Sequence, residues 1–167
     1  MFAFLKNTVY VRIKPEWLSV IHLESRKEFS DIPTLAIERI KSRHVIIGVG
    51  REAVLMIDRL NVTVKNGFKH PRTLIADFTI AERTLKHFLK KAMPSSLFMP
   101  SPVMIMHPLS HLEGGLTQVE IRAFAELGSA AGARQVYVWQ GRELSHEELR
   151  ELRFSHTAGE LLHPVAA

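Results

Sequence analysis

The chain of 167 residues contains no cysteine, which excludes a disulfide framework, a thiolate metal site and a cysteine nucleophile. It also has no apolar run close to the ~18 residues that a membrane-spanning helix requires. The opening residues, MFAFLKN, lack the basic start and the small-residue cleavage site of a signal peptide. These absences predict a cytoplasmic protein.

Hydrophobic residues make up 46% of the chain and charged residues 23%, so one domain, or one domain with a small lobe, can bury a core. The net charge of +5 indicates an anionic partner, either lipid or nucleic acid. The sequence has no aromatic stacking motif and no recognition-helix pattern, which disfavours nucleic acid.

The order of apolar segments is typical of a mixed α/β protein. Residues 9–13 and 17–23 are strand-like, and Pro15 between them presets the backbone of a tight turn, which predicts a β-hairpin. Further short strands are predicted at residues 27–30, 34–38, 44–50, 61–67 and 72–78, with helical spacing at 51–60.

Capping boxes mark three helix starts, because a hydroxyl and a carboxylate three residues later bind open backbone N–H groups. The boxes are Thr79 with Glu82, Thr117 with Glu120, and Ser145 with Glu148. Residues 103–139 have the pattern strand, helix, strand, which predicts a right-handed crossover between two parallel strands. The tail after Phe154 is polar and small, and we expect it to be frayed.

Five segments resemble, in sequence and in order, the bacterial actin homologue MreB, the rod shape-determining protein family. They are IPTLAIE, IIGVGREA, IADFTIAERTLKHFLKKA, SSLFMPSP and LTQVEIRAFAELGSAAGARQVYVW. The resemblance covers roughly residues 1–139 and only the N-terminal half of that family. It implies an α/β fold, the actin-like (ribonuclease-H-like) subdomain I, with a mixed central sheet and flanking helices. We expect this subdomain at 1–140, with room for a small lobe at about 30–72, and a divergent helix and tail at 141–167.

Members of the resembled family are ATPases, and their first phosphate loop contains Asp-Leu-Gly-Thr. The matching positions here are Arg12, Ile13, Lys14 and Pro15. An arginine cannot hold magnesium, which requires oxygen ligands. Lysine adds a side chain where glycine allows close approach, and proline removes an N–H group. An alternative is that Arg12 and Lys14 attract phosphate as point charges, which gives binding without the metal and little catalysis.

The second phosphate loop of the family is also expected to be missing. Its Glu-Glu-Pro stretch is replaced by residues 140–143, Gln-Gly-Arg-Glu, and the chain ends soon after them. Glu120 matches a family glutamate near the attacking water, although a capping role is the simpler interpretation. The insertion SHLEGG lies directly before that helix. We therefore expect no ATPase activity and no bound cofactor.

The segment PSSLFMPSP places three large apolar residues, Leu97, Phe98 and Met99, in a loop. In the resembled family this loop dips into the inner membrane leaflet, and Lys90 and Lys91 precede it here. Such an anchor is weak and needs either several copies or a second signal. Phe2 and Phe4 in the N-terminal segment are candidates for that signal. The alternatives are that the loop folds back onto the domain and that the N-terminal segment forms a strand.

His107, His111 and Glu113 are grouped in sequence, but Pro108 and two glycines place them in a loop, so we expect no metal site. Asp77 is expected to form hydrogen bonds at a strand end or loop.

Taken together, these residues predict a non-catalytic MreB-like binding or scaffold domain, which self-associates or binds a full-length MreB-type protein or another cell-shape component. It would lie in the cytoplasm or peripherally on the inner face of the membrane. The alternatives are a residual nucleotide-binding module or, less favoured, a nucleic-acid-binding domain.

Overall fold

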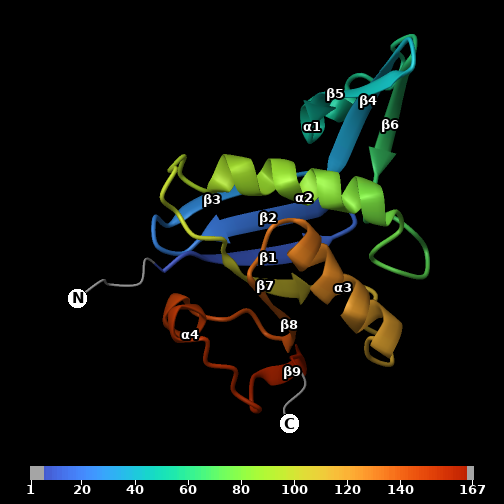
Figure 1. The fold of residues 1–167 in the computed structure, drawn as a ribbon. Coiled ribbons are helices and arrows are strands. Elements are labelled where there is room, and N and C mark those ends of the chain that lie inside the picture. Colours follow the sequence, from blue (N-terminus) through green and yellow to red (C-terminus); the bar gives the residue numbers. More distant parts are fainter. Residues whose placement is uncertain (1–5, 165–167) are drawn as a thin grey trace.

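The computed structural model describes residues 6–164 and contains two β-sheets (Figure 1). The larger sheet has the strand order β3-β2-β1-β7-β8-β9, and the smaller one has the order β5-β4-β6. The strands are β1 (Thr8–Lys14), β2 (Trp17–His22), β3 (Lys27–Asp31), β4 (Thr34–Ile40), β5 (Arg43–Val49), β6 (Val62–Asn66), β7 (Val103–Pro108), β8 (Gln135–Gly141) and β9 (Gly159–His163). The helices are α1 (Arg51–Val54), α2 (Phe78–Ala92), α3 (Gln118–Ala130) and α4 (His146–Glu151).

The larger sheet is mixed, and its centre confirms the two pairings predicted from the sequence. Strands β1 and β2 form an antiparallel hairpin in which Lys14 pairs with Trp17, so Pro15 and Glu16 make the turn. Strand β7 runs parallel to both β1 and β8. Helix α3 connects β7 to β8, as expected of a crossover between parallel strands.

Alternating side chains of β1 serve the two faces of this sheet. Val9, Val11 and Ile13 are fully buried in the main core, against residues of α2 and α3. Figure 1 shows both helices crossing this face. Tyr10 belongs to a second core on the opposite face. Both faces of the sheet at β1 must therefore be packed against other parts of the chain.

The second face is covered by the C-terminal segment, which corrects the expectation of a frayed tail. Leu144 and Leu149 pack with Tyr10 and Trp139. Strand β9 then pairs antiparallel with β8 as the sixth strand. The tail is ordered because α4 and β9 bury the large apolar surface of Trp139, which would otherwise face solvent.

Two other expectations near the small sheet are wrong. Helix α1 ends at Val54, and Ile57 and Leu60 stay 64% and 87% exposed, so no packed face supports further helical turns. Residues 72–78 form no strand. The N–H groups of Ala76 and Asp77 both donate to the Gly67 carbonyl and are thus unavailable to a sheet, although Leu74 enters the core.

The start of α2 is also not where the sequence pattern placed it. Asp77 is the N-cap, and its side chain accepts a hydrogen bond from the N–H of Ile80 at 3.0 Å. Thr79 lies inside the first turn. Aspartate is as good an N-cap as threonine, and Asp77 begins the helix two residues before Thr79 could. The boxes at Thr117 and Ser145 are both formed.

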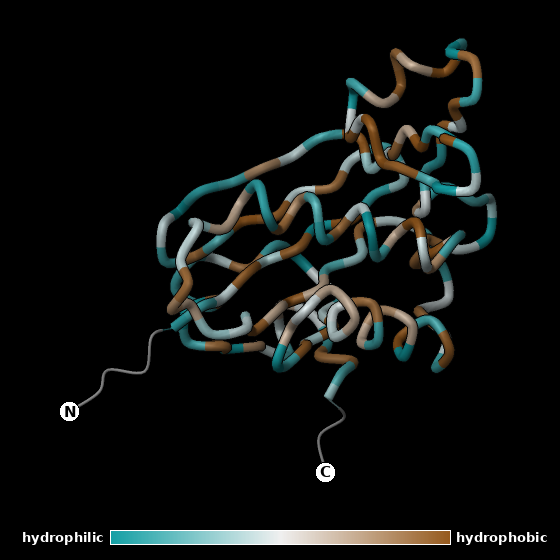
Figure 2. The backbone as a smooth tube through the Cα atoms, turned by 45° about the horizontal axis from the view of Figure 1, so that its top comes forward, coloured by the Kyte–Doolittle hydropathy of each residue, from teal (hydrophilic) through white to brown (hydrophobic). Residues whose placement is uncertain are grey.

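Among residues 6–164, no helix is long and apolar enough to span a bilayer. Figure 2 shows that short hydrophobic and hydrophilic stretches alternate along the chain.

Candidate functional site

Arg12 lies at the centre of a polar cluster near the end of β1. Its Nη1 donates to Glu143 Oε1 at 2.9 Å, and its Nη2 donates to Glu28 Oε1 at 3.0 Å and to Ser19 Oγ at 3.2 Å. The guanidinium carbon lies 4.9 Å from the centre of the Trp17 ring. The side chain is only 15% exposed. Two carboxylates and an aromatic face thus hold one cation in place.

Beneath this cluster, Tyr10 and His107 form a buried pair. The Tyr10 hydroxyl lies 2.5 Å from His107 Nδ1, and His107 Nε2 lies 2.9 Å from the Gly141 carbonyl. Since a carbonyl only accepts, Nε2 carries the proton and Nδ1 accepts from Tyr10. Burial raises the pKa of Tyr10 to about 12 and lowers the pKa of His107 below its usual value. Both groups are therefore neutral near pH 7.

The hairpin turn next to Arg12 is tied to the smaller sheet. The Pro15 carbonyl accepts from Asn66 Nδ2 at 2.7 Å, and Lys69 pairs with Glu16 at 2.6 Å. The side chain of Lys14 is exposed. The structure therefore brings Arg12, Lys14 and Pro15 to one end of the sheet, with a guanidinium rather than a carboxylate at its centre.

Glu120 has the hydrogen bonds of a helix cap. Its Oε2 accepts from the Thr117 backbone N–H and from the Thr117 hydroxyl, both at 2.8 Å. The carboxylate is thus oriented by the start of α3, and these contacts are sufficient to explain its position.

The histidines considered as metal ligands have other partners. Both ring nitrogens of His107 are engaged by Tyr10 and Gly141. His111 Nδ1 lies 3.1 Å from Ser110 Oγ. Within the described part of the chain, no three potential metal-ligating side chains gather at one point.

The loop between α2 and β7 presents its apolar residues to solvent. Leu97 is 99% exposed and Phe98 is 86% exposed, so these two side chains do not fold back onto the domain. Lys90 and Lys91 are exposed in the last turn of α2, and Met99 is half-buried. Phe2 and Phe4 lie outside the described residues. In Figure 1 this loop lies at the end of the sheet where β1 begins.

The C-terminal end of this loop is fixed to the sheet. Asn7 Nδ2 donates to the Pro100 carbonyl at 2.6 Å, and the Asn7 carbonyl accepts from the Val103 N–H at 2.8 Å. The exposed apolar tip therefore projects from a rigid base.

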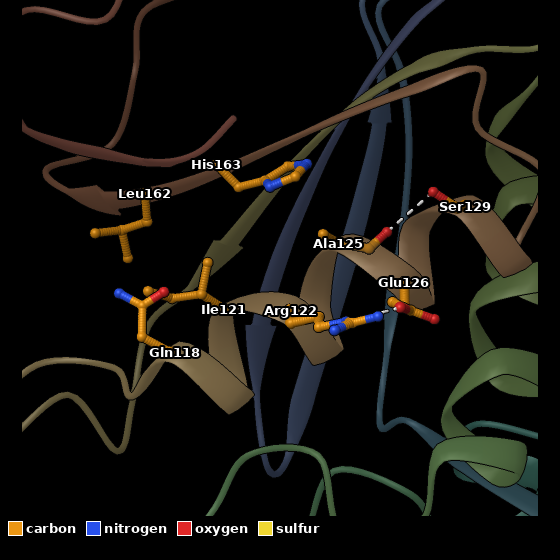
Figure 3. Close-up of a pocket in the computed structure, with 8 residues that line it drawn as sticks. All are labelled: Gln118, Ile121, Arg122, Ala125, Glu126, Ser129, Leu162 and His163. Carbon is orange, nitrogen blue, oxygen red and sulfur yellow. Dashed lines mark hydrogen bonds and ion pairs between the residues drawn. The ribbon is translucent and has the colours of Figure 1, made fainter. Parts of the chain in front are cut away.

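A hollow of about 620 Å³ lies between α3 and β9 (Figure 3). Ile121 and Leu162 line its apolar part, and Arg122 pairs with Glu126 at 3.1 Å along the helix surface. Because that pair neutralises itself and the hollow holds none of the predicted site residues, we assign it no role.

Sequence reasoning identified Arg12 and the apolar loop but missed the partners of Arg12. Glu28 and Glu143 lie 16 and 131 residues from Arg12 in the chain, and only the folded structure brings them together. The alternation of side chains along β1 could have placed Tyr10 and Arg12 on one face. No sequence signal could have identified Glu143 as the partner.

The chain is similar to cell shape-determining proteins of the MreB and Mbl type. The family model described as MreB/Mbl protein matches residues 21–144. The cell shape-determining protein MreB of Pasteurella multocida is 37% identical over 102 residues, which is 60% of this chain and 28% of that protein. The cell shape-determining protein Mbl of Bacillus subtilis is 31% identical over 100 residues, again 28% of its length. The aligned part of the chain thus spans less than a third of these curated relatives.

Solved structures show the same fold. MreB5 of Spiroplasma citri bound to AMPPNP superposes with a TM-score of 0.63 at 15% identity, over 80% of this chain and 38% of that one. A non-polymerising MamK mutant bound to AMPPNP gives 0.64 at 14% identity, over 83% and 42%. These neighbours confirm the predicted actin-like α/β fold with a mixed sheet and flanking helices. The family match covers most of the chain, and the chain therefore belongs to the MreB/Mbl protein family.

Proposed function

We propose that this chain is a non-catalytic MreB-like binding domain that attaches peripherally to the inner face of the cell membrane and serves cell shape. The observation that carries the proposal is the Arg12 cluster. Its guanidinium is held by Glu28 and Glu143 at the hairpin that corresponds, by resemblance, to the first phosphate loop of the family.

The charge at this position opposes metal-dependent chemistry. A magnesium ion needs oxygen ligands, and here both nearby carboxylates are already paired with a fixed cation. Pro15 lacks the N–H group with which a phosphate loop binds its ligand. Without a metal to neutralise developing charge, phosphoryl transfer loses its main source of stabilisation.

Calorimetric titration with ATP, in the presence and absence of magnesium, tests this part. We expect no magnesium-dependent binding and no phosphate release. Micromolar affinity that requires magnesium would contradict the proposal. Micromolar affinity without magnesium would favour the alternative in which Arg12 and Lys14 hold phosphate as point charges, and Arg12→Gln should then abolish it.

Membrane attachment is supported by the exposed loop. Burial of Leu97 and Phe98 contributes roughly 1.5–3 kcal/mol each. Each basic residue near an anionic surface adds about 1 kcal/mol, and Lys90 and Lys91 are close in sequence. The result is a weak and reversible anchor that becomes effective when several copies act together.

Co-sedimentation with phosphatidylglycerol vesicles tests the anchor. Leu97→Ala/Phe98→Ala should lose most of the binding. Leu55→Ala/Leu60→Ala is the matched control, because it removes two equally exposed apolar side chains, 81% and 87%, from the region after α1. Equal losses in the two double variants would reject the loop as the anchor.

The proposed partner is a second copy of this chain, a full-length MreB-type protein or another cell-shape component. Membership of the MreB/Mbl protein family supports this choice. Sedimentation velocity, with and without a full-length MreB, should show a complex. Monomers throughout would contradict the proposed scaffold role.

A further inference from the structure

A second, smaller hollow of about 350 Å³ opens directly beside the apolar loop. It lies between the last turns of α2 and α3. Its polar lining consists of Lys86, Lys90, Ser95 and Ser96, and its apolar lining includes Leu89 and Pro102. The hollow thus adjoins the two side chains that the proposed function places in the membrane.

The polar groups of this hollow suit an anion. Lys86 pairs with Glu82 one turn earlier, whereas Lys90 makes no ion pair with any other described residue. Ser96 Oγ accepts from the Phe98 N–H at 3.3 Å, and its own hydrogen remains available to donate. One unneutralised ammonium and two serine hydroxyls are the donors that bind a phosphate oxygen.

The surroundings of the hollow are also cationic. Residues 93–102 contain no acidic side chain. Arg134 is anchored beside the loop, since its backbone N–H donates to the Pro102 carbonyl at 2.9 Å. Burial lowers the pKa of His87, and the positive charges of Lys90 and Lys91 lower it further. A positive potential therefore covers this end of α2.

One feature of the site opposes anion binding. The carboxyl ends of α2 and α3 both face this region, and each carries a partial charge of about −0.5. The carbonyls that end α3 are partly satisfied, because Leu127 and Ser129 accept from Ala131 and Gly132. The full positive charge of Lys90, which lines the hollow, opposes what remains of these partial charges.

We propose that this hollow seats the phosphate of an anionic phospholipid headgroup while Leu97 and Phe98 enter the acyl region below it. The proposal rests on the membrane attachment argued above and specifies its ligand. Lys90 and the hydroxyls of Ser95 and Ser96 would contact the phosphate, and Leu89 and Pro102 would contact the glycerol carbons.

Adjacent lysines provide the test. Lys90→Gln and Lys91→Gln remove the same charge one position apart, but only Lys90 lines the hollow, whereas Lys91 lines a different groove near β5. With phosphatidylglycerol vesicles, we expect Lys91→Gln to weaken partitioning by no more than about fivefold, as for any surface cation. Lys90→Gln should weaken it at least threefold more than Lys91→Gln does, and Ser95→Ala/Ser96→Ala should weaken it at least threefold with no change in charge.

Equal losses for the two lysine variants, with no loss for the serine variant, would overturn the headgroup site and leave only diffuse attraction. In that case a loss for Leu97→Ala/Phe98→Ala would still uphold the membrane anchor. Absence of vesicle binding by the wild type would overturn both. Titration with soluble glycerol 3-phosphate, followed by the amide signals of Ser95 and Ser96, separates the two sources of phosphate. Binding as tight as to vesicles would overturn a lipid ligand, and much weaker binding would support it.

Discussion

Arg12 and Glu143 are 131 residues apart in the sequence, yet the Arg12 guanidinium donates to the Glu143 carboxylate at 2.9 Å. The contact joins β1 to the segment that follows β8. Glu143 is 60% exposed, so solvent screens this ion pair and its own contribution is small. The packing of Arg12 on Trp17 and its second contact with Glu28 carry more of the local stability.

Replacement of Arg12 should therefore cost more than replacement of its partner. We expect Arg12→Ala to lower the free energy of unfolding by about 1–2 kcal/mol, since it removes buried stem, aromatic packing and hydrogen bonds. Glu143→Gln should cost about 0.5 kcal/mol. Urea denaturation measures both, with the exposed Lys14→Ala as a nearly neutral control. Equal costs for Arg12→Ala and Glu143→Gln would show that the ion pair dominates.

The buried His107 should make stability depend on pH. Burial lowers its folded pKa, so the unfolded chain binds the proton more readily. The contribution of His107 to the free energy of unfolding is then fully present above the unfolded pKa of about 6.5. It decreases as the pH falls below that value, by up to about 1.4 kcal/mol per pH unit for one group. Urea midpoints between pH 7.5 and 5 measure this change.

The matched variant for this experiment is His107→Gln, whose amide can still donate to the Gly141 carbonyl. It should be less stable at pH 7.5 but lose less stability on acidification. His22 and His87 also have lowered pKa values and contribute to the wild-type slope. An unchanged slope in the variant would assign the effect to those two residues.

The start of α2 distinguishes two candidate caps directly. Asp77→Ala should lower the free energy of unfolding by about 1 kcal/mol, because the Ile80 N–H loses its acceptor. Thr79→Ala, two residues later, should change it by less than about 0.5 kcal/mol. If Thr79→Ala lowers the free energy of unfolding more than Asp77→Ala does, Thr79 is the N-cap, as the sequence pattern predicts.

The C-terminal segment should be part of the folding unit. The Phe154 ring lies 5.6 Å from Trp139 and 5.1 Å from Tyr137. Phe154→Ala should cost about 1–3 kcal/mol, somewhat less than a fully buried aromatic. A chain ending after Gly141 should aggregate or bind a hydrophobic dye, since Trp139 and Tyr10 lose their cover. His156→Ala, in an exposed position nearby, is the control. A well-folded truncated chain would show that residues 142–164 are dispensable.

Local patterns in the sequence were enough for several elements. The Pro15 turn and its flanking strands, the crossover through α3, and the boxes at Thr117 and Ser145 were all predicted, because each depends on residues within one or two turns. The segments that carry the MreB resemblance led to the actin-like fold. That Leu97 and Phe98 lie in a loop also follows from local chemistry, since the prolines and serines around them prevent regular structure, whereas their exposure was decided only by the structure.

Only the tertiary structure decided the rest. Asp77 rather than Thr79 begins α2 because the Gly67 carbonyl accepts from the N–H groups of Ala76 and Asp77 and so fixes the backbone at this point. Residues 159–163 become a strand because β8 offers a free edge and Trp139 an uncovered face, and neither is visible in the tail itself. The partners of Arg12 and the hollow at Lys90 join segments that are distant in sequence. Periodicity and spacing report on neighbours along the chain, whereas these contacts depend on how sheets and helices meet in space.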